Sequence, residues 1–498
     1  MYPSLEQAKQ IAASGEYRRI PVCRELLSDR FTTIEVMRTL RAASSHCYLL
    51  ESAESHQQWG RYSFLGYAPT LEITCMNGIV KIRKGEDICT GRGAVTEEIR
   101  QESPQDVIRE VLQEYKSPKM EGMPPFTGGL VGYFSYDYIC YSEPTLKLGG
   151  EDREAFQDVD LMLFDRVIAF DNYRQKLILI CGVSVENLEQ SYRRAEKKLQ
   201  EMEELLKSSV KAYFPPIRLE EEIRPCFPKE RYEGMVEKAK HYIREGDIFQ
   251  VVLSNPMEAK AEGSLFDTYR ILRTTNPSPY MFYFTSDDIE LVGASPETLV
   301  KLEDGILHTF PLAGTRPRGR DREEDRRLEK ELLADEKELA EHNMLVDLGR
   351  NDIGKISEIG SVHVEKYLSI ERYSHVMHIG STVAGRIRSD KDAVDAVDAI
   401  LPAGTLSGAP KLRACQIIDE LEGRKRGVYG GAIGYLDFTG NLDTCIAIRL
   451  AFKKNGRVTI RSGAGIVADS VPEKEFEECC NKAKAVVSAL KQAEEGAE

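Results

Sequence analysis

Runs of apolar residues, some of them alternating with polar ones, predict β-strands in both halves of the chain. In the first half, Leu71–Cys75 and Lys176–Cys181 have the length and composition of strands. In the second half the same pattern recurs at 248–253, 290–292, 299–302 and 306–310. Glycine-rich segments at 430–435 and 463–465 predict turns between the last strands.

Helical patterns lie between these strands. A charged helix is predicted from 184 to 207, and it must end before Phe214-Pro215-Pro216 because consecutive prolines cannot continue a helix. We expect a linker between Lys207 and Lys229. Further helices are predicted at 230–245, 323–350 and 391–400.

Strands and helices are mixed without a strict βα alternation. This order favours an α+β fold, in which large, mainly antiparallel β-sheets pack as a sandwich with helices outside. A chain of 498 residues is too long for one ordinary core. We therefore expect two regions, residues 1–225 and residues 226–498, which interleave in space.

Composition narrows the class of protein. The chain is 42% hydrophobic and 30% charged, as soluble globular proteins are, and its net charge of -14 disfavours a nucleic-acid partner. No apolar run is long enough to span a membrane, and Met1–Glu25 lacks the apolar core of a signal peptide. The eleven cysteines do not have the spacing of a zinc site, so reduced thiols and a cytoplasmic location fit best.

Two acidic pairs far apart in the chain are the strongest candidates for chemistry. Glu338 and Glu341, and likewise Glu475 and Glu478, are three residues apart in helical patterns, so each pair shares one helix face. Four converging carboxylates need a cation, and Mg2+, a hard ion that prefers oxygen ligands, suits them. A single pair of this kind on a charged helix is usually a solvated face, so the flanking residues must decide between the two interpretations.

The flanking residues form ordered blocks at Pro311–Gly319, Glu341–Asp352, Pro402–Lys411 and Arg461–Ile466. Together these blocks resemble the chorismate-utilising enzymes, and the chain is similar to the anthranilate synthase component I branch of that family. The resemblance is dense from Lys229 to Ala489 and reaches the first half through Leu49–Ser52 and Gly60–Ser63. It implies that residues 226–498 form the chorismate-binding catalytic region and that residues 1–225 are regulatory and structural.

The resemblance assigns Mg2+ to the two acidic pairs. It implies that Glu341 and Glu478 are direct ligands, and that Glu338 and Glu475 act directly or through water. This agrees with the chemistry of Mg2+, which keeps several waters and uses few protein carboxylates when an anionic ligand completes its shell.

Chorismate carries two carboxylates, and the resemblance implies a partner for each. The metal and the backbone amides around Gly463 and Gly465 are expected to hold the ring carboxylate. Arg449, assisted by Tyr429, is expected to bind the enolpyruvyl carboxylate, because a guanidinium group suits bidentate contact. Lys482 either contacts the substrate or forms an i,i+4 pair with Glu478.

The reaction that the resemblance implies adds ammonia at C2 of the ring, removes the C4 hydroxyl and then eliminates pyruvate to give anthranilate. Glu297 matches the general acid of the family, which needs a raised pKa from burial or neighbouring carboxylates. Thr315 and Thr405 are expected to hydrogen-bond the ring substituents. His378 matches the histidine of pyruvate elimination, although a lone histidine in an apolar stretch is more often a core residue.

Two positions separate the possible nucleophiles. Relatives that add water, forming isochorismate or salicylate, carry a lysine where this chain has Gln250, and glutamine cannot deprotonate water. Relatives that aminate the para position typically carry a lysine where this chain has Ala313. Ammonia as nucleophile and the ortho product are therefore the expected outcome.

The chain has no catalytic module of a glutamine amidotransferase. The resemblance therefore implies a separate amidotransferase subunit, anthranilate synthase component II, as the source of ammonia. With that partner the chain would carry out the first step of tryptophan biosynthesis.

A regulatory site is implied in the other half of the molecule. Leu49–Ser52 and Asn276–Met281 match the segments that bind tryptophan as feedback inhibitor in the family. The expected contacts are Glu51 to the ligand ammonium, Ser52 by hydrogen bond, Pro279, Tyr280 and Met281 around the indole, and Cys445.

Cys445 and Arg449 are expected on one strand, so a shift caused by the ligand would reach the substrate site there. Ordinary strand and turn structure is the alternative interpretation of these segments. A different class of protein, a non-catalytic tryptophan-binding subunit, would have lost part of the acidic constellation, and every expected carboxylate is present.

Overall fold

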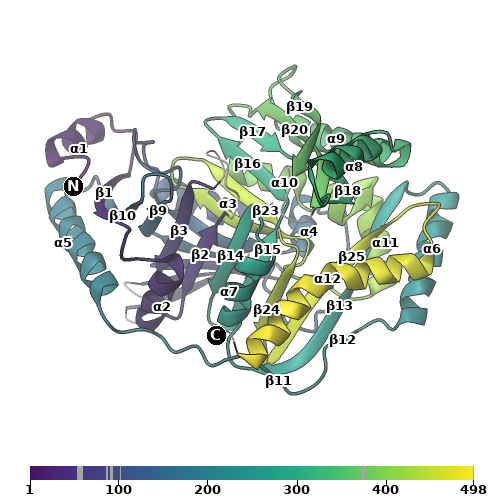
Figure 1. Cartoon of the computed structure of the whole chain (residues 1–498). Helices are drawn as coiled ribbons and strands as arrows, with labels where there is room; N and C mark the ends of the chain where they lie inside the picture. The colour runs from purple at the N-terminus through teal and green to yellow at the C-terminus, as the bar shows by residue number, and fades with distance from the viewer. Residues whose placement is uncertain (53–59, 86–87, 90–92, 101–102, 373–375, 497–498) are drawn as a thin grey trace.

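The computed structural model describes residues 1–52, 60–85, 88–89, 93–100, 103–372 and 376–496 (Figure 1). Within these ranges two large β-sheets dominate, one of thirteen strands and one of twelve. Neighbouring strands in both sheets are antiparallel. The predicted α+β class with large antiparallel sheets is confirmed.

The first sheet contains, in spatial order, β1 (Arg19–Leu27), β10 (Lys176–Ser184), β9 (Arg166–Asp171), β3 (Tyr62–Tyr67), β2 (Cys47–Glu51), β14 (Tyr280–Thr285), β15 (Ile289–Ser295), β24 (Leu450–Lys454), β25 (Arg457–Ile466), β13 (Gln250–Glu262) and β11 (Arg218–Leu219). Two short strands also pair with β13, namely β12 (Arg224–Pro225) and β21 (Gly408–Ala409).

The second sheet contains, in spatial order, β18 (Leu312–Pro317), β20 (Val376–Arg386), β17 (Ile306–Thr309), β16 (Thr298–Glu303), β23 (Leu442–Ile446), β22 (Ala432–Asp437), β7 (Gly129–Phe134), β8 (Val159–Phe164), β4 (Leu71–Met76), β5 (Ile79–Lys84) and β6 (Val95–Arg100). The remaining strand, β19 (His363–Arg372), pairs with β20.

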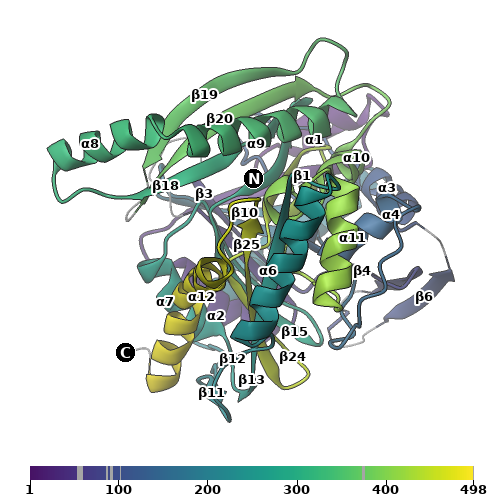
Figure 2. The same cartoon turned by 90° about the vertical axis from the view of Figure 1, so that its right-hand side faces the viewer.

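Helices surround the sheets (Figures 1 and 2). They are α1 (Leu5–Ala12), α2 (Thr33–Ala43), α3 (Gln105–Glu114), α4 (Ile139–Ser142), α5 (Leu188–Lys207), α6 (Lys229–Arg244), α7 (Phe266–Thr275), α8 (Arg322–Leu333), α9 (Glu336–Gly354), α10 (Ala393–Ile400), α11 (Lys411–Glu422) and α12 (Pro472–Glu495). Short 3-10 turns lie at η1 (Tyr136–Tyr138) and η2 (Gly404–Leu406).

The two sheets pack face to face through a core rich in aromatic side chains. Tyr48 of β2 meets Phe164 of β8 edge to face, with ring centroids 4.7 Å apart. On the opposite face of the first sheet, α2, α5, α7 and α12 bury their apolar sides, and α3, α9 and α10 do the same on the second sheet. This arrangement is a sandwich with helices outside.

Strands from the two parts of the chain lie side by side in both sheets. In the first sheet β2 pairs with β14, so that Glu51 lies opposite Met281. In the second sheet β7 pairs with β22, so that Gly132 lies opposite Gly434. Residues 1–225 and 226–498 therefore share both sheets. The segment predicted as a linker contributes β11 and β12 to the edge of the first sheet.

The helix predicted from 323 to 350 is in fact two helices, α8 and α9. The chain breaks at Asp335 because this residue caps the second helix. Its side chain accepts hydrogen bonds from the backbone N–H groups of Lys337 and Glu338. The cap places the first acidic pair in the first turns of a new helix.

The turn predicted at 463–465 is wrong, because these residues lie inside β25. Gly463 lies opposite Ser254, and Gly465 opposite Val252, in the antiparallel register with β13. A Cβ on Gly463 would lie 2.7 Å from the Leu253 carbonyl oxygen. Glycine therefore allows a close approach between strands here, where the sequence pattern indicated a turn.

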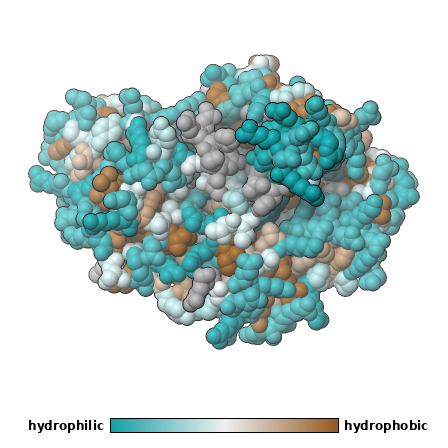
Figure 3. Space-filling view, viewed as in Figure 1, coloured by the Kyte–Doolittle hydropathy of each residue, from teal (hydrophilic) through white to brown (hydrophobic). Residues whose placement is uncertain are grey.

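The face of the molecule in Figure 3 is mainly hydrophilic, most strongly over α8 and α9. The arginines of this area pair with neighbouring acids, such as Arg318 with Asp325 at 2.5 Å and Arg327 with Glu331 at 2.8 Å. None of the helices in the described ranges has the length and apolar character needed to cross a membrane.

Gly66 of β3 tests the packing between the sheets. A Cβ at this position would lie 2.2 Å from Cε1 of Tyr48 and 2.8 Å from Cδ1 of Phe164. We predict that Gly66→Ala lowers the free energy of unfolding by roughly 1–3 kcal/mol, because a rigid core resists added volume. The midpoint of urea denaturation, followed by circular dichroism, measures this.

Gly234→Ala is the matched control, because no atom lies within 4 Å of a Cβ at this position in α6. That variant should keep or raise the midpoint, since alanine is the better helix former. A Gly66→Ala midpoint equal to that of the unaltered chain would contradict the close packing at β3.

Candidate active site

A cavity of about 550 Å³ lies between α9, α12 and the pair β13–β25. Figure 2 shows β25 between α9 above and α12 below. Every residue predicted for catalysis, substrate binding or metal binding lines this cavity: Gln250, Glu297, Thr315, Glu338, Glu341, His378, Thr405, Tyr429, Arg449, Gly463, Gly465, Glu475, Glu478 and Lys482. The fold thus brings segments that are far apart in the sequence to one place.

The four carboxylates come from two helices, with Glu338 and Glu341 on α9 and Glu475 and Glu478 on α12. Burial raises the pKa of Glu341, and the carboxylates of Glu338 and Glu478 raise it further. Burial also raises the pKa of Glu475, with Glu478 adding to the effect. Oxygen donors that repel one another in a buried cavity fit a hard divalent cation.

Basic side chains offset only part of this charge. Lys482 Nζ lies 2.8 Å from Glu478 Oε1, and Arg316 lies 3.6 Å from Glu338 Oε1. The i,i+4 pair considered for Lys482 is therefore present, and Lys482 lines the cavity as well. Among the described residues, the four glutamates do not bring three ligand atoms within 4.8 Å of one another. A shared ion would need bridging waters or rotated side chains, which Mg2+ accommodates.

Glu297 lies in the loop between β15 and β16. Thr405 of η2 donates a hydrogen bond to Glu297 Oε2 at 3.1 Å. Burial raises the pKa of Glu297, while this hydrogen bond and the charge of Arg449 oppose the rise. The carboxyl group is thus held in place and retains its proton to higher pH than an exposed glutamate does.

His378 of β20 lies opposite Thr315 of β18. Its Nδ1 is 3.0 Å from the Gly314 carbonyl oxygen and 3.0 Å from Thr315 Oγ1. A carbonyl oxygen can only accept, so Nδ1 carries the hydrogen and Nε2 is the basic nitrogen. Burial lowers the pKa of His378, against the opposing hydrogen bond to Gly314, and favours the neutral ring.

The two glycines of β25 leave space for side chains of the cavity wall. A Cβ on Gly465 would lie 2.8 Å from Gln250 Nε2, and one on Gly463 would lie 3.1 Å from the Tyr429 hydroxyl. Gln250 and Tyr429 therefore rest directly on the strand. Any larger residue at either glycine would push these side chains into the cavity.

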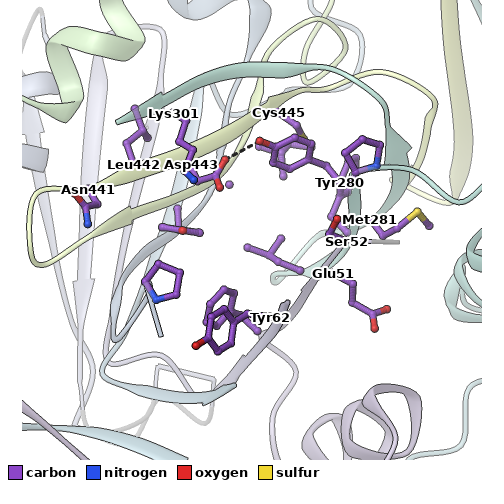
Figure 4. Close-up of a pocket in the computed structure, with 18 of the residues that line it drawn as sticks. Glu51, Ser52, Tyr62, Tyr280, Met281, Lys301, Asn441, Leu442, Asp443 and Cys445 are labelled. Carbon is purple, nitrogen blue, oxygen red and sulfur yellow. Dashed lines mark hydrogen bonds between the residues drawn. The ribbon is translucent and has the colours of Figure 1, made fainter. Parts of the chain in front are cut away.

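A second cavity, of about 110 Å³, lies between the sheets at β2, β14, β16 and β23 (Figure 4). All residues predicted for the effector line it: Glu51, Ser52, Pro279, Tyr280, Met281 and Cys445. Its wall also contains Tyr62, Lys301, Tyr435 and Asp443. We call it the effector cavity.

The Glu51 carboxylate points away from Asp443 in Figure 4. It lies 2.7 Å from Arg273 and accepts hydrogen bonds from Tyr269 at 2.5 Å and Thr33 at 2.7 Å. Asp443 faces the effector cavity instead and accepts a hydrogen bond from Tyr280 at 2.8 Å. The contact predicted between Glu51 and a ligand ammonium stays a prediction, with Asp443 as a second candidate.

Comparison with known proteins decides the family. The model of the chorismate binding enzyme family matches residues 15–488. The chain is 46% identical to anthranilate synthase component 1 of Acetivibrio thermocellus and 44% identical to that of Aquifex aeolicus, and 99% of this chain and of each relative is covered. The chain belongs to the chorismate-binding enzyme family.

Solved structures agree with this membership. Anthranilate synthase component I from Streptococcus pneumoniae is 41% identical, with a TM-score of 0.75 over 87% of this chain and 93% of that chain. The menaquinone-specific isochorismate synthase from Escherichia coli has a TM-score of 0.67 at 19% identity, covers 98% of each chain and shows the shared fold alone. The α+β sandwich is therefore the architecture of the chorismate-binding enzymes.

Sequence analysis missed a buried ion cluster beneath the site of this family member. Glu422 of α11 is fully buried and accepts hydrogen bonds from Arg426 and Arg461, each at 2.5 Å. Arg461 also donates to Ser254 Oγ at 2.8 Å, so the cluster joins α11, β13 and β25. The one signal in the sequence was the position of Arg461 in the block Arg461–Ile466, because Arg461 is far along the chain from Glu422 and Ser254.

Arg449 is not on the same strand as Cys445, contrary to the prediction. β23 ends at Ile446, and Arg449 lies between β23 and β24 with φ +50°. The Ala294 N–H donates to its carbonyl oxygen at 3.1 Å and holds this left-handed conformation. The expected route from Cys445 to Arg449 along one strand of this chorismate-binding enzyme is therefore wrong.

Proposed function

We propose that this chain is the ammonia-using large subunit of an anthranilate synthase. It converts chorismate and ammonia to anthranilate, pyruvate and water, the first step of tryptophan biosynthesis, with Mg2+ as cofactor. The observation that supports the proposal most is that all residues predicted for catalysis, substrate binding and metal binding line one cavity. The relatives of the chain, 44–46% identical over 99% of its length, are anthranilate synthase components.

Substrate binding requires positive charge in an acidic protein. Arg449 is suited to the enolpyruvyl carboxylate, because its guanidinium group faces the cavity at a fixed point between two strands. Glu341 and Glu478, with Glu338 and Glu475, would hold Mg2+. The bound ion would neutralise these side chains and the ring carboxylate of chorismate. Lys482 beside Glu478 would adjust the remaining charge.

Glu297 is proposed as the acid that protonates the C4 hydroxyl, which leaves as water while ammonia bonds to C2. The raised pKa of Glu297 keeps a proton available for this step. Thr405 donates to the other oxygen of the carboxyl group and orients it toward the substrate. Hydroxide without protonation would be a poor leaving group.

His378 is proposed as the base of the second step. Its neutral ring presents Nε2 as acceptor for the proton on C2, and the hydrogen bond from Nδ1 to Gly314 fixes that tautomer. Loss of this proton and cleavage of the bond from C3 to the enolpyruvyl oxygen make the ring aromatic. The enolpyruvyl carbon takes up a proton and leaves as pyruvate.

Gln250 beside Gly465 is proposed to face the incoming nucleophile. Its amide does not deprotonate water, and ammonia needs no base to add. A glutamine amidotransferase subunit would supply the ammonia, because most ammonia is protonated at neutral pH. Tryptophan, the end product, is proposed to bind in the effector cavity and to inhibit.

An assay of the purified chain tests the catalytic proposal directly. With chorismate, Mg2+ and ammonium sulfate we expect anthranilate, identified by mass and fluorescence, at a rate that rises with pH as more ammonia is unprotonated. Chelation of Mg2+ should stop the reaction. Isochorismate or salicylate formed without ammonium would contradict the proposed role of Gln250, and full turnover after chelation would contradict the cofactor.

Glu341→Gln tests the metal site. We predict a loss of roughly 100-fold or more in kcat/KM, or a matching rise in the Mg2+ concentration required, because one negative ligand is lost. Glu336→Gln, also on α9 but exposed, is the control and should leave both values unchanged. Thermal unfolding should be similar in the two variants. A large drop in melting temperature for Glu341→Gln alone would mean a structural role.

Ser52→Phe tests the effector cavity. Ser52 Oγ is buried and has no hydrogen-bond partner among the described residues, so it is available to a ligand. Phenylalanine would fill the small cavity and should raise the tryptophan concentration for half inhibition at least tenfold, roughly 1.4 kcal/mol, with little effect on turnover. Inhibition identical to that of the unaltered chain would reject the site.

A further inference from the structure

The catalytic and effector cavities approach each other at the start of β16. Glu297, immediately before β16, lines the catalytic cavity. β16 and β23 line the effector cavity through Lys301 and Asp443. Thr298, the first residue of β16, lies between Glu297 and this part of the strand.

Thr298 is tied to the effector cavity by a short chain of hydrogen bonds. The Tyr280 hydroxyl lies 2.8 Å from Asp443 Oδ1 (Figure 4). It also lies 3.0 Å from Thr298 Oγ1. An ionised carboxylate can only accept, so Tyr280 donates to Asp443 and accepts from Thr298. The direction of these two hydrogen bonds, from Thr298 to Tyr280 and from Tyr280 to Asp443, depends on Asp443 remaining available as the final acceptor.

Thr298 is tied equally closely to the catalytic cavity. It follows Glu297 directly, and the Glu297 carbonyl oxygen accepts a hydrogen bond from the Ile446 N–H at 2.9 Å. Ser295 Oγ lies 3.3 Å from the Glu297 N–H and donates to the Ile446 carbonyl oxygen at 2.7 Å. The backbone of Glu297 is thus held between Thr298 and β23. A displacement of Thr298 would act directly on the peptide of Glu297, to which it is bonded.

We propose that the hydrogen bond between Tyr280 and Thr298 transmits ligand binding in the effector cavity to Glu297. This inference rests on the proposed function and specifies its regulation. A ligand ammonium that pairs with Asp443 competes with the Tyr280 hydroxyl for the Asp443 carboxylate. Tyr280 then donates to Thr298, the order of donors reverses, and Thr298 moves with the peptide of Glu297. Thr298 is a positioning residue, because it acts through Glu297 without contact with the substrate.

Thr298→Val tests the link, because valine keeps the shape of threonine and lacks the hydroxyl. The dissociation constant of tryptophan is measured by calorimetry with and without saturating chorismate, in Mg2+ buffer free of ammonium. The ratio of the two constants is the coupling between the cavities. We expect about tenfold for the unaltered chain and less than about twofold for Thr298→Val. Without chorismate, the variant should bind tryptophan within about threefold of the unaltered chain.

Three further variants make the result specific. Thr298→Ser restores the hydroxyl and should restore the ratio. Tyr280→Phe should lower the ratio of the two dissociation constants as Thr298→Val does. Combining Tyr280→Phe with Thr298→Val should lower it no further, because both changes remove the same hydrogen bond. Thr444→Val removes a hydroxyl from the same pair of strands, β16 and β23. This hydroxyl donates to the Val300 carbonyl oxygen at 3.0 Å and is not part of the hydrogen bonds that join Asp443, Tyr280 and Thr298. This control should keep the ratio.

The outcomes separate the link from the function on which it rests. If Thr298→Val keeps the tenfold ratio of dissociation constants, or if Thr444→Val lowers the ratio as much as Thr298→Val does, the proposed role of the Tyr280–Thr298 hydrogen bond is wrong. The proposed catalytic function would be unaffected. Absence of tryptophan binding to the unaltered chain overturns the effector site together with the link. Absence of anthranilate from chorismate and ammonium overturns the catalytic proposal, whereas the binding ratio is measured without turnover.

Discussion

The pairing of β13 with β25 is the constraint on which the catalytic cavity depends. Its register sets Gln250 beside Gly465 and aligns Gly463 with Ser254. A slip of one residue would turn these side chains to the opposite face of the sheet. The buried cluster of Glu422 and Arg461 opposes such a slip, because moving either strand would separate fully desolvated charges. α12 is the next element after β25, and its position is set by the end of that strand. The second acidic pair therefore depends on the same register.

Burial makes the carboxylates of the catalytic cavity costly to ionise. The pKa values of Glu297, Glu341 and Glu475 are all raised by burial, which means that the protein alone solvates these carboxylates poorly. A dianionic substrate would add to this repulsion, whereas the proposed divalent cation would reduce it. Metal and substrate are therefore expected to bind cooperatively, with each completing the environment of the other.

Much of the site was predictable from residue order, and the reasons for the exceptions are physical. Acidic pairs at helical spacing and ordered motif blocks are local patterns, so they can be recognised in the sequence. The mixture of strands and helices without strict βα alternation was enough to predict the α+β class. The break at Asp335 was missed because a capping aspartate resembles any charged residue within a long polar helix. Gly463 was misread because glycine marks both turns and close strand contacts. The contacts of Arg461 with Glu422 and Ser254, and of Thr298 with Tyr280, join different elements and became visible only in three dimensions.

The pairing of early with late strands in both sheets has a consequence for synthesis on the ribosome. β2 is synthesised long before its neighbour β14, because Glu51 pairs with Met281. Likewise, β13 is synthesised before its partner β25, which lies near the end of the chain. Until then the nascent polypeptide exposes unpaired strand edges with apolar faces. Such edges recruit other chains as readily as the correct neighbour. Productive maturation thus depends on shielding these edges, by chaperones or by rapid completion, until the last strand is released.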